Sequence, residues 1–189
     1  MMPRDLLAPI LLLASCAPPA TPSDVAAADP QALVVCPRGD TVPGIDVSHW
    51  QDTIDWDQVA TTEARFAIVR VSHGTGVRDR QFERNWPEVR RVGLIRGVYQ
   101  FFSAEDDPIA QADLLIDAIG GSYTQGDLPP VLDVEGMSLD GPPASVAVAN
   151  MRAWLAHVEA RLGVRPILYT ARYFWRDELG DPDFSDYPL

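Results

Sequence analysis

The chain has 189 residues, 47% of them hydrophobic and 22% charged, which is typical of a globular domain with a sizeable core. Its formal net charge of −12 argues against a nucleic-acid-binding protein, because binding to phosphates requires a basic surface. The charge says little about a sugar substrate.

The first residues have the pattern of an export signal. An arginine near the start is followed by an apolar stretch from Leu6 to Ala14, which is shorter than the roughly 20 residues needed to span a bilayer. We therefore predict a signal peptide over residues 1–15. The residues before Cys16 resemble a bacterial lipobox, which implies lipidation of Cys16. With Ala17 after it, we expect a lipid-anchored cell-envelope protein at the outer membrane; the alternative is an ordinary signal peptide and a secreted protein.

Residues 16–40 form the second predicted region. Proline, alanine, serine and aspartate dominate its first half, a composition typical of an extended, flexible tether. Residues 41–189 are predicted to form one folded domain. Cys36 is the second of two cysteines, so lipidation of Cys16 would leave it without a partner in this chain.

Strand-like runs alternate with helix-like segments through this domain. The runs are short and apolar, and begin at Gly44, Arg65, Ile95, Pro129 and Arg165. The helix-like segments cover residues 55–63, 80–93, 107–121 and 143–163. This alternation predicts an α/β fold of parallel strands joined by right-handed crossovers. It is either a (β/α) barrel or a doubly wound open sheet, and no G-x-G-x-x-G motif supports a dinucleotide-binding sheet.

The fourth run, PPVLDVEG at 129–136, carries two acids where a buried strand would be apolar. Side chains two residues apart in a strand point to one side, so Asp133 and Glu135 share a face. In a barrel this strand end lies at the open mouth, as does Asp46 at the end of the first strand. Close like charges raise one pKa, so one carboxyl can act as general acid while the other stays anionic, as in glycoside hydrolysis. The alternative is a strand end that is solvated or paired with arginine.

Four motifs carry a family resemblance. GIDVSHWQDTIDW, GVYQFF, PPVLDVEG and ILYTARYFW occur in this order, one per strand. Together they resemble the glycoside hydrolase family 25 lysozymes, the Chalaropsis-type muramidases, from about Gly44 onward. The resemblance implies hydrolysis of the β-1,4 bond between N-acetylmuramic acid and N-acetylglucosamine in peptidoglycan. It also implies an irregular TIM-like (β/α) barrel of about five βα units, with the closing strands missing and the catalytic domain at 41–189 incomplete at its C-terminus.

The resemblance also assigns roles to the three acids. Glu135 matches the general acid, Asp133 the partner carboxylate of the D-x-E motif, and Asp46 an acid that orients groups near the reaction centre. A second carboxylate can stabilise cationic character at the anomeric carbon. The 2-acetamido group of muramic acid could instead be the nucleophile, and Asp133 would then steady that amide.

Four aromatic residues are expected to bind the sugar rings, although core packing is an alternative for Phe101 and Trp175. The set is Tyr99, Phe101, Tyr169 and Trp175. The family usually has histidine where this chain has Gln100, a position expected to point away from the face of Tyr99.

Two other functions remain open from the sequence. One is a glycan-binding barrel without catalysis, and the other is a metal-dependent carbohydrate hydrolase or deacetylase. His49 and His73 each follow a serine near a strand, but their spacing matches no metal-binding pattern, so we predict no metal and no other cofactor. The expected partners of this monomer are peptidoglycan glycan strands and, through the lipid anchor, a membrane.

Overall fold

The computed structural model describes residues 40–137 and 141–189. By its contacts the chain divides into residues 1–42 and Pro43–Leu189, and all helices and strands of the described residues lie in the second unit. The predicted signal peptide, Cys16, Cys36 and the predicted tether up to residue 39 lie outside the described residues. Among the residues that are described, no helix combines the length and the apolar character needed to cross a membrane.

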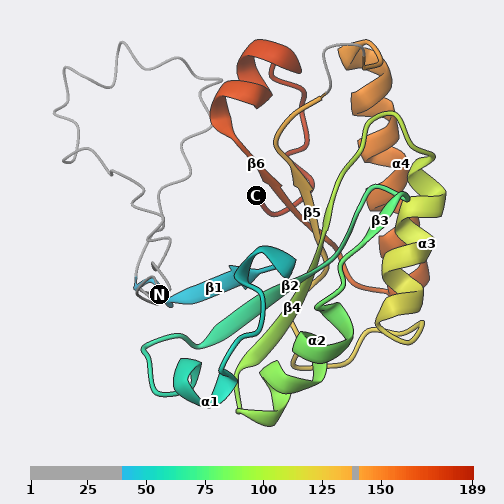
Figure 1. The fold of residues 1–189 in the computed structure, drawn as a ribbon. Coiled ribbons are helices and arrows are strands. Elements are labelled where there is room, and N and C mark those ends of the chain that lie inside the picture. Colours follow the sequence, from blue (N-terminus) through green and yellow to red (C-terminus); the bar gives the residue numbers. More distant parts are fainter. Residues whose placement is uncertain (1–39, 138–140) are drawn as a thin grey trace, which may run out of the picture. The chain divides into compact units, whose positions relative to one another are not determined.

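The second unit alternates strands and helices along its length (Figure 1). Its strands are β1 (Gly44–Val47), β2 (Phe66–His73), β3 (Val77–Arg78), β4 (Ile95–Phe101), β5 (Val131–Val134) and β6 (Ile167–Thr170). Its helices are α1 (Trp56–Val59), α2 (Phe82–Arg91), α3 (Pro108–Ala118) and α4 (Ala144–Leu162), with a 3₁₀ turn η2 (His49–Gln51) and a π-helical turn η3 (Phe174–Glu178). Each predicted strand and helix is therefore present.

The strands form one sheet in the order β1-β2-β4-β5-β6, with every neighbouring pair parallel. Short β3 pairs antiparallel with β2. The strands lie side by side in chain order, without the reversal that a doubly wound sheet requires, so that alternative is wrong. The sheet curls into a half-barrel with β1 and β6 at its edges, and no barrel closure is seen within the described ranges (Figure 1).

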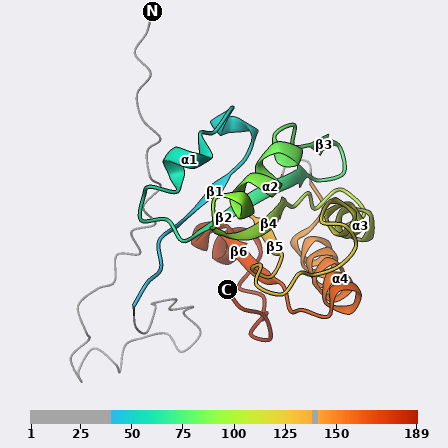
Figure 2. The ribbon, with the colours of Figure 1, turned by 90° about the horizontal axis from the view of Figure 1, so that it is seen from below.

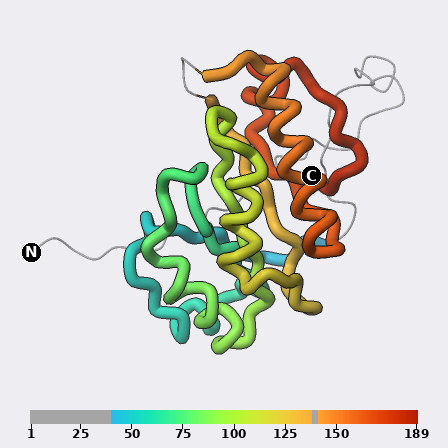
Figure 3. The backbone as a smooth tube through the Cα atoms, turned by 90° about the vertical axis from the view of Figure 1, so that its right-hand side faces the viewer, coloured from blue at the N-terminus to red at the C-terminus, as the bar shows by residue number. Residues whose placement is uncertain are grey.

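Helices α2, α3 and α4 cover one side of the sheet, which we call the outer face (Figure 2). Helices α3 and α4 also pack against each other and lie side by side in Figure 3. Most strand residues of the outer face are apolar, and six of them are at most 3% exposed: Val47, Ala67, Val69, Val98, Leu132 and Leu168. Burying a side chain of this size contributes about 1.5–3 kcal/mol, so the helix layer fixes the register of the strands. The opposite side is the inner face.

The helix ends lie where capping residues occur in the sequence. The side chain of Asp55 accepts a hydrogen bond from Gln58 N at 3.1 Å at the start of α1. Asp107 does the same for Ile109 N at 2.8 Å at the start of α3. At the end of α4, Gly163 has a φ of 67°, the left-handed conformation that glycine adopts without a Cβ clash. Asp55 and Asp107 thus begin helices, and Gly163 ends one and returns the chain to the sheet.

Candidate active site

Strand register brings acidic and aromatic side chains together on the inner face. Asp133 of β5 pairs with Phe101 of β4 on one side and with Tyr169 of β6 on the other. Residues paired in this way across parallel strands point to the same side of the sheet. Tyr99 lies two residues before Phe101 and therefore also belongs to the inner face.

Asp46 and Arg70 reach the inner face from the other half of the sheet. Asp46 of β1 pairs with Ile68 of β2, and Arg70 follows two residues later on the same side. Arg70 is itself paired with Tyr99. The charges of Asp46, Arg70 and Asp133 all act on the phenol of Tyr99. Together with Tyr169 of β6, these residues come from five strands and form a single site.

The acidic cluster, defined as Asp46, Asp133 and Glu135, is graded in exposure. Asp46 is exposed, Glu135 is half-buried at the end of β5, and Asp133 is buried with 8% of its surface exposed. Within the described residues, Asp133 Oδ1 has no hydrogen-bond partner. A buried carboxyl oxygen without a partner is costly in a folded protein, so this atom is available to a bound ligand.

The surroundings of Asp133 favour its neutral form. Burial, followed by the charges of Glu135 and Asp46, raises the pKa of Asp133 to about 8, against the opposing charge of Arg70. At neutral pH the Asp133 carboxyl is therefore mostly neutral. The family resemblance gives the role of proton donor to Glu135, which lies two residues after Asp133 in the chain.

Two tyrosines flank Glu135 at the open end of β5. Burial raises the pKa of Tyr169, and Glu135 raises it further both by its charge and through a hydrogen bond with the phenol. The Tyr173 hydroxyl donates a hydrogen bond to the Glu135 carbonyl oxygen at 3.4 Å. Both tyrosine side chains are exposed, at 39% and 60% respectively, so aromatic surface lies beside this carboxylate where a sugar ring could stack.

The remaining aromatic residues predicted for sugar binding differ in their surroundings. Tyr99 is buried, and its pKa is raised chiefly by that burial. Phe101 is half-buried, and the centroid of its ring lies 4.7 Å from that of His73 in an edge-on arrangement. Trp175 is not brought to the acidic cluster, because it is 4% exposed in η3 and packs edge-on against Phe184 at 5.4 Å. Its neighbours are those of the hydrophobic core.

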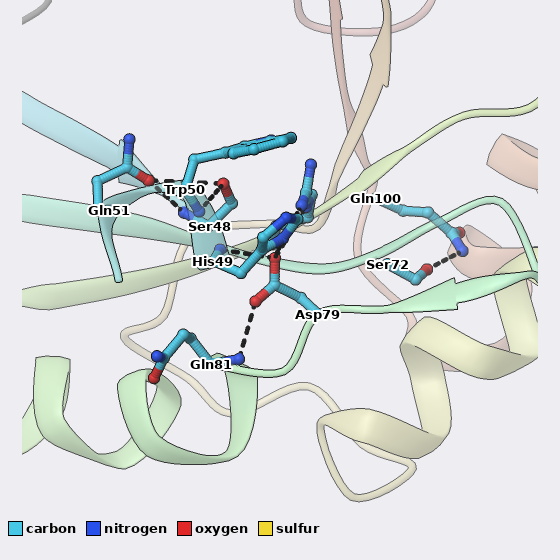
Figure 4. Close-up of polar contacts among 9 residues, drawn as sticks. Ser48, His49, Trp50, Gln51, Ser72, Asp79, Gln81 and Gln100 are labelled. Carbon is cyan, nitrogen blue, oxygen red and sulfur yellow. Dashed lines mark hydrogen bonds and ion pairs between the residues drawn. The ribbon is translucent and has the colours of Figure 1, made fainter. Parts of the chain in front are cut away.

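A buried charged group next to the acidic cluster was missed from the sequence. Asp79 Oδ2 accepts hydrogen bonds from Arg70 Nε at 3.0 Å and from the backbone N–H of His49 at 2.9 Å. The His49 ring also contacts this oxygen at 3.1 Å, and its Nδ1 contacts the guanidinium of Arg70. Figure 4 shows Asp79 between His49 and Gln81. Burial opposes ionisation of Asp79, but the hydrogen bonds from His49, Gln81 and Arg70 outweigh it and lower its pKa.

Gln100 lies on the outer face, as expected from the alternation of the strand. It is fully buried, donates a hydrogen bond from Nε2 to Ser72 Oγ at 2.8 Å, and accepts one at Oε1 from Trp154 Nε1 at 2.7 Å. Figure 4 shows Gln100 and Ser72 paired apart from the group around Asp79. Gln100 therefore joins β4 to β2 and α4 and does not belong to the acidic cluster.

The donor set of the site suits proton transfer and sugar binding better than metal binding. Within residues 40–137 and 141–189, no group of three or more histidine, cysteine or acidic residues is arranged to hold a metal ion. Three carboxyl groups of different exposure, a fixed arginine and several aromatic rings face one another at the carboxyl ends of parallel strands. Catalytic groups of (β/α) barrels occur at this end.

Comparison with known proteins gives the same family from sequence and from fold. Residues 45–189 match Glycosyl hydrolases family 25. The chain is 36% identical to YegX of Escherichia coli K12 over 157 residues, which is 80% of this chain and 56% of YegX. It is 34% identical to lysozyme M1 of Streptomyces globisporus over 140 residues, which is 71% of this chain and 48% of that protein. The chain thus spans about half the length of these relatives.

A solved structure extends the likeness to the fold. The muramidase from Acremonium alcalophilum matches with a TM-score of 0.71 and 26% sequence identity, covering 78% of this chain and 74% of that one. The family match covers most of the chain and includes Asp46, Asp133 and Glu135. The chain therefore belongs to Glycosyl hydrolases family 25.

Proposed function

We propose that this protein is an N-acetylmuramidase, which hydrolyses the β-1,4 bond between N-acetylmuramic acid and N-acetylglucosamine in peptidoglycan. The observation that carries the proposal is the convergence of Asp46 and Asp133 on the inner face of a family 25 sheet, with Glu135 directly after β5 and its charge acting on Asp133. Relatives named lysozyme and muramidase support the same substrate. Glycoside hydrolysis needs one carboxyl that gives a proton and a second that stabilises positive charge.

Glu135 is the proposed general acid. It is half-buried at the end of β5, beside the exposed rings of Tyr169 and Tyr173, whereas Asp133 lies deeper in the sheet. A carboxyl at this position can reach the glycosidic oxygen of a chain lying across the strand ends. The charge of Glu135 acts on Asp133, and in the proposed reaction Glu135 gives a proton to the leaving-group oxygen.

Asp133 and Asp46 are the proposed supporting carboxylates. Asp133 would either attack the anomeric carbon or hold the 2-acetamido group of the muramic acid while that group attacks. Its Oδ1, unpaired within the described residues, is available for such a hydrogen bond. Asp46 would add negative charge near the developing oxocarbenium ion, and Arg70 would limit the repulsion between the carboxylates.

Tyr99, Phe101 and Tyr169 are the proposed sugar contacts, since all three belong to the inner face around Asp133. A closed TIM-like barrel, attachment to the cell envelope through a lipid on Cys16, and action as a monomer on glycan strands belong to the same proposal. They follow from the family resemblance and from the export pattern of the first residues.

The test is lysis of purified bacterial cell walls, followed by turbidity. We expect Glu135→Gln to lose about 10²–10⁴-fold in rate, the range that removal of a general acid costs, with an unchanged circular dichroism spectrum. Glu63→Gln is the matched control, because Glu63 is exposed between α1 and β2, and its rate should equal that of the wild type. Undiminished lysis by folded Glu135→Gln would refute the assignment of the acid.

A further inference from the structure

We propose that Asp79 is a positioning residue for the acidic cluster: it holds Arg70 and His49 so that the guanidinium stays on the inner face beside Asp46 and Asp133. Its effect on catalysis rests on the proposed function, whereas the position of the guanidinium is a property of the fold alone.

Asp79 is fixed by hydrogen bonds from three separate segments. Its Oδ2 accepts from Arg70 Nε in β2 and from the backbone N–H of His49 at the start of η2. Its Oδ1 accepts from the backbone N–H of Gln81, just before α2, at 3.0 Å. The side chain is only 1% exposed. A carboxylate with both oxygens bound in this way cannot rotate without breaking several charge-assisted hydrogen bonds.

The backbone that carries Asp79 also determines where Arg70 points. Arg70 pairs with Tyr99, but the next paired residue is Ser72, opposite Gln100, so Val71 is an extra residue in the strand. Such a bulge re-aims the side chains next to it. Here the backbone N–H of Asp79 donates to the carbonyl oxygen of Val71 at 2.8 Å. Asp79 is therefore tied both to the bulge and to the arginine that precedes it.

The groups facing Asp133 explain why a fixed cation matters. Glu135 at its own strand end and Asp46 from β1 repel its negative form, and Arg70 from β2 is the cation that favours it. The phenols of Tyr99 and Tyr169 also lie within the influence of these carboxyls. An arginine free to turn to solvent would leave the carboxyls without this compensation.

The rival explanation is that Asp79 and Arg70 form a purely structural ion pair. The chain offers a matched control in Arg96 and Asp127, whose Nε–Oδ2 distance is 2.9 Å and whose side chains are 11% and 9% exposed. Arg96 lies near the start of β4, at the opposite end of the strands from the acidic cluster. A purely structural role predicts similar behaviour of the two pairs, whereas a positioning role predicts that only Asp79 affects Asp133.

The experiment is an NMR titration of the Asp133 side-chain carboxyl carbon in the full chain, in the wild type and in Arg70→Gln, Asp79→Asn and Asp127→Asn. We expect Arg70→Gln to raise the midpoint by about one unit or more, the effect of losing a nearby opposite charge. Asp79→Asn should raise it in the same direction, and Asp127→Asn should leave it unchanged. An unchanged or lowered midpoint in folded Asp79→Asn would overturn the proposal.

Arg70→Lys covers the case in which Asp79→Asn does not fold. Lysine keeps the charge but has no Nε–H fork for Asp79 to hold, so its midpoint should lie between those of the wild type and Arg70→Gln. A midpoint equal to that of the wild type would mean that the held geometry is irrelevant. Because the titration does not depend on lysis, shifted midpoints without cell-wall lysis would refute the proposed function and leave this inference standing.

Discussion

The two ends of the sheet differ in how the carboxyl group of an aspartate is hydrogen-bonded. Near the start of β4, Asp127 accepts two hydrogen bonds from arginines. One oxygen accepts from Arg96 Nε at 2.9 Å and the other from Arg90 Nη2 at 2.8 Å. At the carboxyl end of β5, Asp133 is buried, yet its Oδ1 has no partner within the described residues, and two further acids act on it. The paired aspartate is suited to stability, and the unpaired one to binding and chemistry.

This difference shows how the fold accommodates a buried carboxyl group that lacks a full set of hydrogen-bond partners. An ionised carboxylate at the position of Asp133 would be costly, and the protein keeps it neutral by retaining a proton to about pH 8. Arg70 moderates this effect but is itself held by Asp79. Pairing of both oxygens, as at Asp127, would leave no oxygen of Asp133 available to a bound substrate.

The largest expected effect comes from removing the unpaired acid. Asp133→Asn should lose about 10²–10⁴-fold in cell-wall lysis and yet gain stability at alkaline pH. The folded-state pKa of about 8 lies above the unfolded value, so the wild type loses stability as pH rises from about 4 to about 8. Asn at this position abolishes that loss, and urea denaturation at pH 8 should give a gain of about 2 kcal/mol or more.

A wild-type stability that does not fall between these pH values would contradict the retained proton. The matched variant is Asp46→Asn, which changes an exposed carboxyl of the same cluster. It should reduce lysis and make the fall in stability with pH smaller without abolishing it, because burial is the largest cause of the raised pKa of Asp133.

Breaking the ion pair between Asp127 and Arg96 should lower stability and leave activity nearly unchanged. Asp127→Ala leaves Arg96 buried without its partner, and removing one member of a buried pair typically costs about 3–5 kcal/mol. We expect a lower urea midpoint, with a lysis rate per folded molecule close to that of the wild type when both are measured at low temperature. A selective loss of lysis at unchanged stability would show that the two ends do not differ in the way described.

A smaller effect is expected at the edge of the acidic cluster. Tyr169→Phe removes the phenol that is hydrogen-bonded with Glu135 but keeps the aromatic ring. One hydrogen bond to a charged group contributes about 1.5–3 kcal/mol when buried, and less at this exposed site, so lysis should fall only about three- to tenfold. Tyr173→Phe is the control, because its hydroxyl hydrogen-bonds to the backbone oxygen of Glu135, at 3.4 Å. Equal losses in both variants would argue against a specific role of Tyr169.

Much of the fold follows from local sequence signals. The apolar runs mark the strands, and Asp55, Asp107 and Gly163 mark helix ends through their ordinary capping chemistry. The alternation of side chains along a strand is enough to put Gln100 on the face opposite Tyr99. The order of the strands does not follow from these signals, because apolar runs are equally compatible with a half-barrel and a doubly wound sheet.

The arginine cluster and the surroundings of Trp175 could not be read from the sequence. A bulge at Val71 has no distinct residue signature, so the direction of Arg70 was open, and Asp79 reaches it through the β2–β3 hairpin. An arginine inside the apolar run of β2 was the one available signal. The burial of Trp175 depends on the turn η3 and its contact with Phe184, which periodicity does not predict.

The most direct test of the central claim is to identify the reducing ends released from purified peptidoglycan. Mass spectrometry after borohydride reduction distinguishes the two sugars. If Glu135 and its neighbouring carboxyl groups catalyse hydrolysis of the β-1,4 bond between N-acetylmuramic acid and N-acetylglucosamine, the wild type releases fragments that end in reduced N-acetylmuramic acid. Glu135→Gln then releases none. Fragments that end in reduced N-acetylglucosamine, or equal release by the two proteins, would contradict the account.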